Sequence, residues 1–243
     1  MDFVKKESIY FISDIHLLAF PNQYPQLLQA LSFIEKKADH LYILGDLFGV
    51  WWGPDYQYPP FDRWYDVFTT LSCPISFLPG NRDFLFDKKM TQRWGWNCLT
   101  PGHVIDYAGK KIALFHGDEP GLLDRSYQRI RPILRSSFLK NLFLTLPEPL
   151  RQKMCLKARI SREDHQQWTP LEIDYQKWIM QSRQIPEIII HGHLHYEKIT
   201  YYDEITIYQL GSWDGGAASM LEIKKTGEIN FLDSTLFTKD FFL

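Results

Sequence analysis

The sequence predicts an α/β protein in which buried strands alternate with helices and build a layered sheet. Short apolar runs recur along the chain, and each ends in a polar cluster. Helical patterns separate the first three of these runs. Hydrophobic residues make up 45% of the 243 residues and charged residues 23%, which is typical of a globular protein. A chain of this length can bury a core unaided, so we expect one domain spanning residues 1–243.

Five apolar runs have the character of buried strands whose carboxyl ends present polar residues. They read IYFISDIH from Ile9, LYILGD from Leu41, ISFLPGN from Ile75, IALFHGD from Ile112 and IIIHGHLH from Ile188. A sixth run, TIYQLGSW from Thr206, has the same form but ends without metal-binding residues. Sites in layered α/β sheets form outside the carboxyl ends of strands, so we expect the functional residues there.

Helices are expected between the first and second strands and between the second and third. In the first interval, apolar residues at helical spacing follow Pro25, a residue well suited to the first turn; they are Leu27, Leu31 and Ile34. The second interval repeats the pattern at Phe61, Trp64, Tyr65, Phe68 and Leu71. We expect these aromatic residues in the core rather than at a cofactor.

Residues 122–183 break the alternation and are predicted to form a helical insertion over the site. Its helical patterns are interrupted by Pro132, Pro147, Pro149 and Pro170. Between Leu122 and Arg162, ten basic residues stand against two acidic ones, a local charge of +8 in a chain whose net charge is −2. Either a solvated helical face or an anionic partner explains this charge.

An apolar stripe accompanies those charges within the insertion. It comprises Phe138, Leu139, Leu142, Phe143, Leu144 and Leu146. Apolar residues beside cations suit a lipid phosphate and an anionic membrane surface. The same side chains can also close the core of the insertion itself, and the two interpretations are compatible.

The polar residues after the five strands repeat one theme. They read DxH, GD, GN, HGD and GHxH, and they offer oxygen and imidazole ligands for divalent transition metals. Strand geometry explains the spacing: in an extended strand residues i and i+2 point the same way, so Asp14 with His16, and His193 with His195, can bind at one place. Glycines flank the ligands and allow the backbone close to the metals: Gly45, Gly80, Gly117 and Gly192.

The blocks DIH, GDLF, GNRD, HGD and GHLH, between Ser13 and His195, resemble the five blocks of the calcineurin-like metallophosphoesterase family. The resemblance implies an αββα sandwich with two divalent metal ions. One metal would be held by Asp14, His16, Asp46 and His195, and the other by Asp46, Asn81, His116 and His193, with Asp46 bridging the two.

The resemblance implies manganese as the ion; mixed oxygen and nitrogen ligation permits manganese without excluding iron, zinc or cobalt. Two cations about 3.5–4 Å apart can clamp a phosphoryl group and activate a water as the nucleophile. The resemblance further implies catalytic roles for Asn81, Arg82 and His116, and substrate contacts from Arg82, Asp124, Ser161 and His193.

Arg82 follows Asn81 at a position where many relatives carry histidine. Arginine cannot donate a proton to a leaving group, but its planar fork can bind phosphate in a bidentate way. A phosphomonoester leaving group, with a second pKa near ~6, needs little protonation. Arg82 therefore favours hydrolysis of a diphosphate. The alternative is that Arg82 merely pairs with Asp83.

Longer stretches resemble the family of UDP-2,3-diacylglucosamine pyrophosphatases of the lipid A pathway. They are YILGDLF, GNRDFL, LDRSYQ after HGD, and IIIHGH. This resemblance implies that water attacks the uridine-side phosphorus of UDP-2,3-diacylglucosamine. The products would be UMP and 2,3-diacylglucosamine 1-phosphate (lipid X), and the acyl chains would lie beneath the insertion. Departures at Gly49, Pro54, Leu194 and near Trp168 leave sugar and acyl specificity open.

Two alternative functions remain. One is a calcineurin-like phosphoesterase that acts on a nucleotide, a nucleic acid or another lipid-linked diphosphate. We do not expect a nucleic-acid partner, because the positive charge is confined to one segment rich in leucine. The other is an inactive scaffold, which the complete set of seven metal ligands argues against. No obligate protein partner is evident.

The sequence predicts a cytoplasmic protein that associates peripherally with the anionic cytoplasmic face of the inner membrane. The first ten residues lack the apolar stretch of a signal peptide, and no window approaches the ~18 apolar residues of a membrane span. Cys73, Cys98 and Cys155 are scattered without CxxC spacing, which indicates a reducing compartment rather than a disulfide framework.

Overall fold

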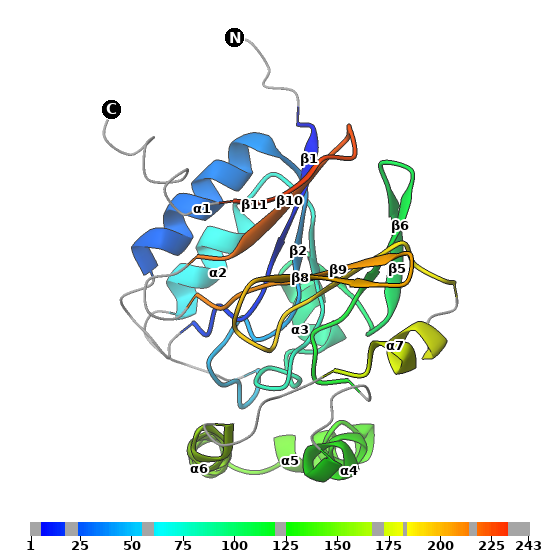
Figure 1. Cartoon of the computed structure of the whole chain (residues 1–243). Coiled ribbons are helices and arrows are strands. Elements are labelled where there is room, and N and C mark those ends of the chain that lie inside the picture. The colour runs from blue at the N-terminus through cyan, green and yellow to red at the C-terminus, as the bar shows by residue number, and fades with distance from the viewer. Residues whose placement is uncertain are drawn as a thin grey trace.

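Two mixed β-sheets form the centre of the protein (Figure 1). The computed structural model describes residues 6–17, 24–54, 61–119, 125–166, 173–181, 184–213 and 218–232. The six-stranded sheet has the order β11-β10-β1-β2-β3-β4, and the five-stranded sheet has the order β5-β6-β7-β9-β8. The α/β class is therefore confirmed.

All six strands that the apolar runs predict are present. The six-stranded sheet contains β1 (Ser8–Ile12), β2 (Ala38–Ile43), β3 (Ile75–Phe77), β4 (Asn97–Cys98), β10 (Met220–Lys224) and β11 (Ile229–Leu232). The five-stranded sheet contains β5 (His103–Tyr107), β6 (Lys110–Leu114), β7 (Ile188–His191), β8 (Lys198–Tyr202) and β9 (Ile205–Gln209). Strands β1, β2 and β3 run parallel to one another, as do β6, β7 and β9. The carboxyl ends of the ligand-bearing strands in each sheet therefore lie on one side.

Three hydrophobic clusters separate the layers. The first lies between the two sheets and includes Phe11, Leu114 and Ile190. Tyr10, the neighbour of Phe11, points the opposite way, into a second cluster between the six-stranded sheet and its helices. A third cluster joins the five-stranded sheet to Trp178 of α7 (Tyr175–Gln181). Because β1 is buried on both faces, it reads as a continuous apolar run rather than an alternating one.

Helices α1 (Tyr24–Lys37), α2 (Phe61–Thr69) and α3 (Lys88–Arg93) belong to the first half of the chain. The predicted apolar face of α1, formed by Leu27, Leu31 and Ile34, is buried in the second cluster. In α2, Trp64 and Phe68 are buried there too. Tyr65 is 38% exposed, so its predicted place in the core is wrong; its ring lies against the edge of the core residue Trp94.

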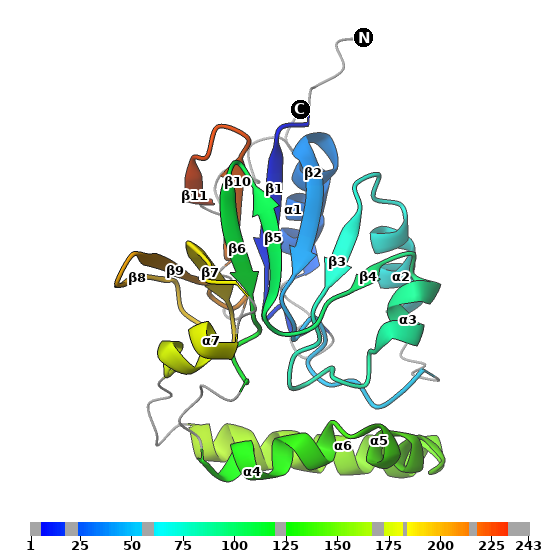
Figure 2. The ribbon, with the colours of Figure 1, turned by 90° about the vertical axis from the view of Figure 1, so that its right-hand side faces the viewer.

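Three helices, α4 (Arg125–Leu134), α5 (Ser137–Leu144) and α6 (Glu148–Gln166), form a separate layer across one end of the two sheets (Figure 2). Ser136 starts α5 as an N-cap, since its hydroxyl accepts a hydrogen bond from the Leu139 amide. The layer is fastened to the sheets by Phe143, which packs on the second cluster, and by the indole of Trp52, which donates to Glu148 at 2.7 Å. Helix α7, by contrast, packs on the five-stranded sheet.

None of the helices in the described ranges is long and apolar enough to cross a bilayer.

Candidate metal centre

Two groups of metal-binding side chains assemble where the ligand-bearing strands end. The first group contains Asp14, His16 and His195, and the second contains Asp46, His116 and His193. Within each group, the ligand atoms lie within 4.8 Å of one another. Both sheets contribute to both groups, so the centre exists only where the two sheets meet.

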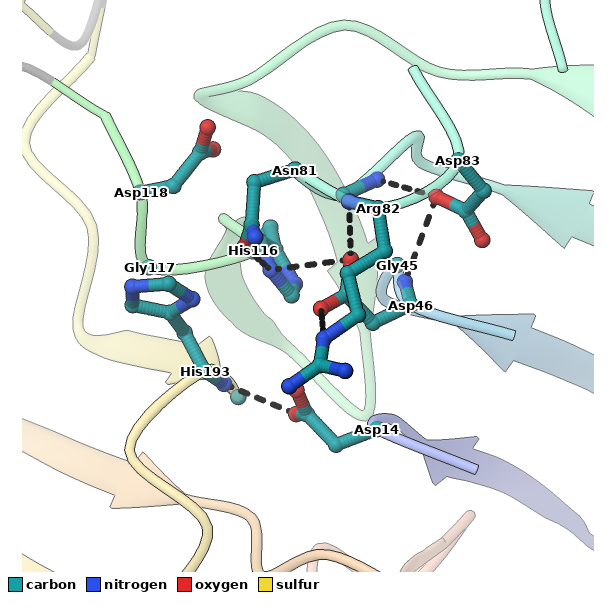
Figure 3. A network of polar contacts seen from close by, with 12 residues as sticks. Asp14, Gly45, Asp46, Asn81, Arg82, Asp83, His116, Gly117, Asp118 and His193 are labelled. Atoms are coloured by element: carbon teal, nitrogen blue, oxygen red, sulfur yellow. Dashed lines mark hydrogen bonds and ion pairs between the residues drawn. The ribbon is translucent and has the colours of Figure 1, made fainter. Parts of the chain in front are cut away.

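Asp46 lies between the two groups. Its Oδ2 atom is 3.6 Å from His16 Nε2, and its Oδ1 atom is 3.5 Å from His116 Nε2. Asn81 lies on the side of the second group, with its Oδ1 atom 3.0 Å from His116 Nε2 (Figure 3). This arrangement suits the predicted bridging role of Asp46 and the ligand role of Asn81, and both roles remain predictions.

The ligand loops do not continue the extended strands. Five of the seven predicted ligands have left-handed backbones, with φ of 53° at Asp14, 54° at His16, 50° at Asp46, 72° at His193 and 66° at His195. Such values are rare outside glycine and cluster at functional sites. The extended geometry predicted for the two i, i+2 pairs is therefore wrong, because β1 ends at Ile12 and β7 at His191. Asp14 and His16 still share a group, whereas His193 and His195 join different groups, as the family resemblance implies.

Glycine is required beside these ligands because the backbone passes close to them. A Cβ atom on Gly80 would overlap the carboxylate of Asp46. On Gly192 it would overlap Ser13 Oγ and Asp14 Oδ2. The structure therefore confirms the close approach predicted at these glycines.

The donors fit divalent cations. Three buried atoms of these side chains, Asp14 Oδ1, Asp46 Oδ2 and His193 Nδ1, have no hydrogen-bond partner among the described residues. Nitrogen atoms of two neighbouring side chains lie at longer distances from the carboxylates: His195 Nε2 is 3.4 Å from Asp14 Oδ1, and Arg82 Nε is 3.4 Å from Asp46 Oδ2. Buried carboxylate and imidazole atoms without a hydrogen bond are costly, and a bound cation would supply the missing partner. His116 Nδ1 lies 2.8 Å from the carbonyl of Leu44, an acceptor that favours the tautomer with Nε2 free to bind a metal.

Electrostatics within the centre are strongly coupled. Burial alone would raise the pKa of Asp46, but the charges of His116, His16 and Arg82 outweigh it and hold that pKa well below its usual range. Burial alone would lower the pKa of His116, yet the surrounding carboxylates, Asp46 first, raise it to about 9. Burial lowers the pKa of His193 to about 3, helped by the charge of His116. An ionised Asp46 and a neutral His193 are the forms that bind a metal, whereas His116 would have to release its proton when a cation takes its place beside the carboxylates.

Arg82 is directed into the centre. Its Nε atom lies 3.4 Å from Asp46 Oδ2, and its backbone amide donates to Asp46 Oδ1 at 2.8 Å. Asp83 turns to the other side of the loop, where it accepts from the Gly80 amide at 2.8 Å (Figure 3). Burial and the negative charge of Asp46 raise the pKa of Asp83 to about 7. The guanidinium therefore faces the metal groups, as expected of a phosphate-binding arginine.

Asp118 is a site residue that the sequence analysis did not single out, although it belongs to the HGD block. Asp118 is fully buried. It accepts hydrogen bonds from Tyr127 and Arg131 of α4 and from Arg135, which follows that helix. Burial alone would raise its pKa, but Arg135 and Arg131 hold that pKa well below its usual range. The sequence did contain one signal for this cluster: Tyr127, Arg131 and Arg135 are spaced four residues apart, which places the three donors on one helix face.

The basic segment is less available to a partner than its count of ten suggests. Arg131 and Arg135 pair with Asp118, and Arg151 is 2% exposed. Arg129, Lys153 and Lys157 are exposed. Two other predicted features, Asp124 and the region of Trp168, lie outside the described residues. Ser161 lies in α6, but its side chain is also outside the described part.

Residues 8–197 match the calcineurin-like phosphoesterase family. The chain belongs to this family. It is a metallophosphoesterase, a hydrolase with buried Asp and His groups that suit two metals. This membership confirms the family resemblance of the five sequence blocks.

Proteins named UDP-2,3-diacylglucosamine hydrolase are similar to this phosphoesterase over most of its length. The one from Haemophilus influenzae (strain PittGG) is 32% identical over 92% of this chain and 98% of its own. One from Neisseria meningitidis serogroup A is 33% identical over 90% of this chain and 95% of its own. One from Aeromonas hydrophila is 37% identical over 77% of this chain and 81% of its own.

Proposed function

We propose that this phosphoesterase hydrolyses the diphosphate of UDP-2,3-diacylglucosamine to UMP and 2,3-diacylglucosamine 1-phosphate (lipid X). The observation that carries the proposal is its similarity to hydrolases of that name over 92% of this chain and 98% of the relative. Coverage this broad takes in the metal groups and the α4–α6 layer together.

The metal centre supplies the chemistry that the proposal needs. Asp14, His16 and His195 would hold one ion; His116, His193 and Asn81 would hold the other, with Asp46 shared between them. When bound, two divalent ions, which we propose are manganese, activate a water and neutralise charge on phosphate oxygens. We assign the catalytic roles to Asn81, Arg82 and His116 on this basis.

Arg82 orients the diphosphate. Its guanidinium lies beside Asp46, so its fork faces the space where the phosphate oxygens would be held. No general acid is required, because the departing lipid phosphate is already a stable anion near neutral pH. His193 would contact the substrate from the second group. Asp124 and Ser161 would contact it from the insertion.

The α4–α6 layer would act as a lid over the acyl chains. Phe138 and Leu142 of α5 are 77% and 52% exposed. Phe143 of the same helix is partly buried and packs against the core. One apolar side chain of the layer is thus packed against the core, while other large apolar side chains stay exposed and could contact a lipid. A nucleotide substrate does not explain these exposed side chains, whereas another lipid-linked diphosphate would explain them equally well and is distinguished only by assay.

Hydrolysis assays on two substrates test the proposal. With Mn²⁺, the purified protein is expected to cleave UDP-2,3-diacylglucosamine and to process deacylated UDP-glucosamine far less efficiently. In ¹⁸O-labelled water the label is expected in UMP, because the uridine-side phosphorus is attacked. Preference for the deacylated compound contradicts the proposed substrate, and label in the sugar phosphate contradicts attack on the uridine-side phosphorus.

Arg82→Lys provides a variant that keeps the charge but removes the planar fork. We expect a lower kcat/KM on the diphosphate, with a smaller effect on p-nitrophenyl phosphate, which offers a single phosphate group to bind. Equal losses on both substrates would show that Arg82 does not select the diphosphate.

We further propose that the protein associates with the anionic cytoplasmic face of the inner membrane through this layer. Exposed Lys153 and Lys157 lie one turn apart on α6, close in sequence to the exposed apolar residue Met154. Flotation with anionic vesicles at low salt is expected to recover the protein, and Lys153→Glu with Lys157→Glu is expected to reduce recovery. Equal recovery with neutral vesicles would rule out charge as the cause.

A further inference from the structure

Arg131 and Arg135 share one buried carboxylate but differ in what else they bind. Arg131 donates from Nε and Nη2 to the two oxygens of Asp118, at 3.0 and 3.1 Å. Arg135 Nη2 donates to Asp118 Oδ2 at 2.8 Å and also to the carbonyl of Gly80 at 2.8 Å. Its Nη1 atom is 3.5 Å from the carbonyl of Pro79. One guanidinium therefore joins the Asp118 loop to the loop that carries Asn81.

Hydrogen bonds hold the backbone of Gly80 at both its amide and its carbonyl group. Its amide donates to Asp83 at 2.8 Å, and its carbonyl accepts from Arg135. Gly80 cannot shift toward Asp46 either, because the carboxylate already fills the space of a Cβ atom. Asn81 follows directly, with its Oδ1 atom 3.0 Å from His116 Nε2. Arg135 therefore binds the backbone immediately before the side chain that meets His116.

The first metal group is held by different parts of the chain. Ser13 Oγ donates to Asp14 Oδ2 at 2.7 Å, and the Trp213 amide donates to the Asp14 carbonyl at 3.1 Å. These contacts come from β1 and from the segment after β9. Neither of these contacts involves Arg135, although the His193 amide also donates to Asp14 Oδ2, at 2.7 Å, and so links the two groups.

We propose that Arg135 is a positioning residue that holds the Asn81 loop against the His116 loop, so that the α4–α6 layer sets the geometry of the second metal group. The proposal depends on the paired metals and on no particular substrate, so it goes beyond the hydrolysis of UDP-2,3-diacylglucosamine. Residues that hold metal ligands in place typically change metal affinity about 10- to 100-fold when replaced.

Arg131→Met is a matched control for Arg135→Met. Each substitution removes one guanidinium from the same carboxylate, but only Arg135→Met also frees the Gly80 carbonyl. Calorimetric titration of the full-length protein with Mn²⁺ is expected to show one of two binding steps weakened about 10-fold or more in Arg135→Met. Both steps are expected to stay near wild type in Arg131→Met.

Two backgrounds identify which metal responds. His195→Ala removes a ligand from the first group. In that background, adding Arg135→Met is expected to weaken the binding of Mn²⁺ at the second group about 10-fold. His193→Ala removes a ligand from the second group. In that background, adding Arg135→Met is expected to change the binding of Mn²⁺ at the first group little. Electron paramagnetic resonance adds a second measurement, because loss of one ion replaces the spin-coupled signal of an Mn²⁺ pair by that of a single ion.

Equal weakening by Arg131→Met and Arg135→Met would overturn the proposal, because both would then act only by loosening α4. Unchanged binding in both would overturn it as well. Should Arg135→Met fail to fold, Arg135→Lys keeps the charge beside Asp118 on a shorter side chain, and the same selective loss is expected. Wild-type binding of both metals in Arg135→Lys contradicts a positioning role. None of these measurements uses substrate turnover, so failure of the proposed activity would leave them interpretable.

Discussion

The strand-end loops and the α4–α6 layer depart from the usual rule of burial in opposite directions. In the loops, Asp14 and Asp46 are 0% and 1% exposed. In the layer, Phe138 and Ile133 are 77% and 60% exposed. Buried charge needs a compensating partner, and a cluster of exposed apolar side chains is common where a ligand or surface binds.

This contrast predicts how the two regions would respond to bound ligands. The loops place carboxylates and imidazoles within 4.8 Å in two groups, so cations and folding are thermodynamically linked there. The exposed residues of the layer contribute little to the core, so its partner is expected to affect binding rather than folding. Substitutions in the two regions should therefore differ in kind.

Asp46→Ala is expected to have the largest effect, because it removes the carboxylate shared by both groups. We predict loss of tight Mn²⁺ binding at both sites and a fall in kcat of more than about 100-fold, beyond the effect of residues that only support ligands. Calorimetry and phosphate-ester hydrolysis measure the two effects. Normal binding of two Mn²⁺ with unchanged activity would show that Asp46 is no bridge.

Mn²⁺ itself is expected to stabilise the folded protein. At a free concentration 100 times the dissociation constant, binding at one site adds about 2.7 kcal/mol to the free energy of unfolding. Thermal melts before and after chelation, and after Mn²⁺ is restored, measure this gain. The Asp46→Ala variant serves as the control and is expected to melt at the same temperature with and without Mn²⁺.

Gly192→Ala tests the close approach of the loop backbones to one another and removes no metal ligand. The added methyl group would overlap Ser13 and Asp14, and overpacking of this kind costs about 1–3 kcal/mol. We expect a lower melting temperature together with weaker Mn²⁺ binding. Gly227→Ala is the control: a Cβ atom there meets nothing within 4 Å, so any loss of stability should leave Mn²⁺ binding intact.

The sequence predicted the strands and the ligand set because both are local patterns. An apolar run followed by a polar cluster is readable without knowledge of the fold, and all six predicted strands exist. The left-handed backbones of Asp14 and His16 were not predictable, because local preference disfavours them and packing between two sheets imposes them.

Partners across the fold were also beyond the sequence. The sequence places Arg131 and Arg135 in a basic segment, which either a solvated helical face or an anionic partner explains. Their spacing shows only that they share a helix face. Their target, Asp118, follows β6 on another element, so the pairing appears only when α4 is placed. Charge counts along a chain cannot separate arginines that serve a partner from those that serve the fold.

Phe138→Ser is expected to have the smallest effect on stability and to sharpen the contrast most. The side chain is 77% exposed, so the free energy of unfolding should change by no more than about 0.5 kcal/mol. Under the proposed function, the same change should raise KM for the acylated substrate and leave kcat nearly unchanged, because it removes contact with the lipid far from the reacting phosphorus.

Phe143→Ser is the matched control on the same helix: that side chain packs on the core, so a clear fall in melting temperature is expected. If Phe138→Ser destabilised the protein as much as Phe143→Ser, the exposed face of α5 would be part of the fold, and the contrast with the strand-end loops would fail.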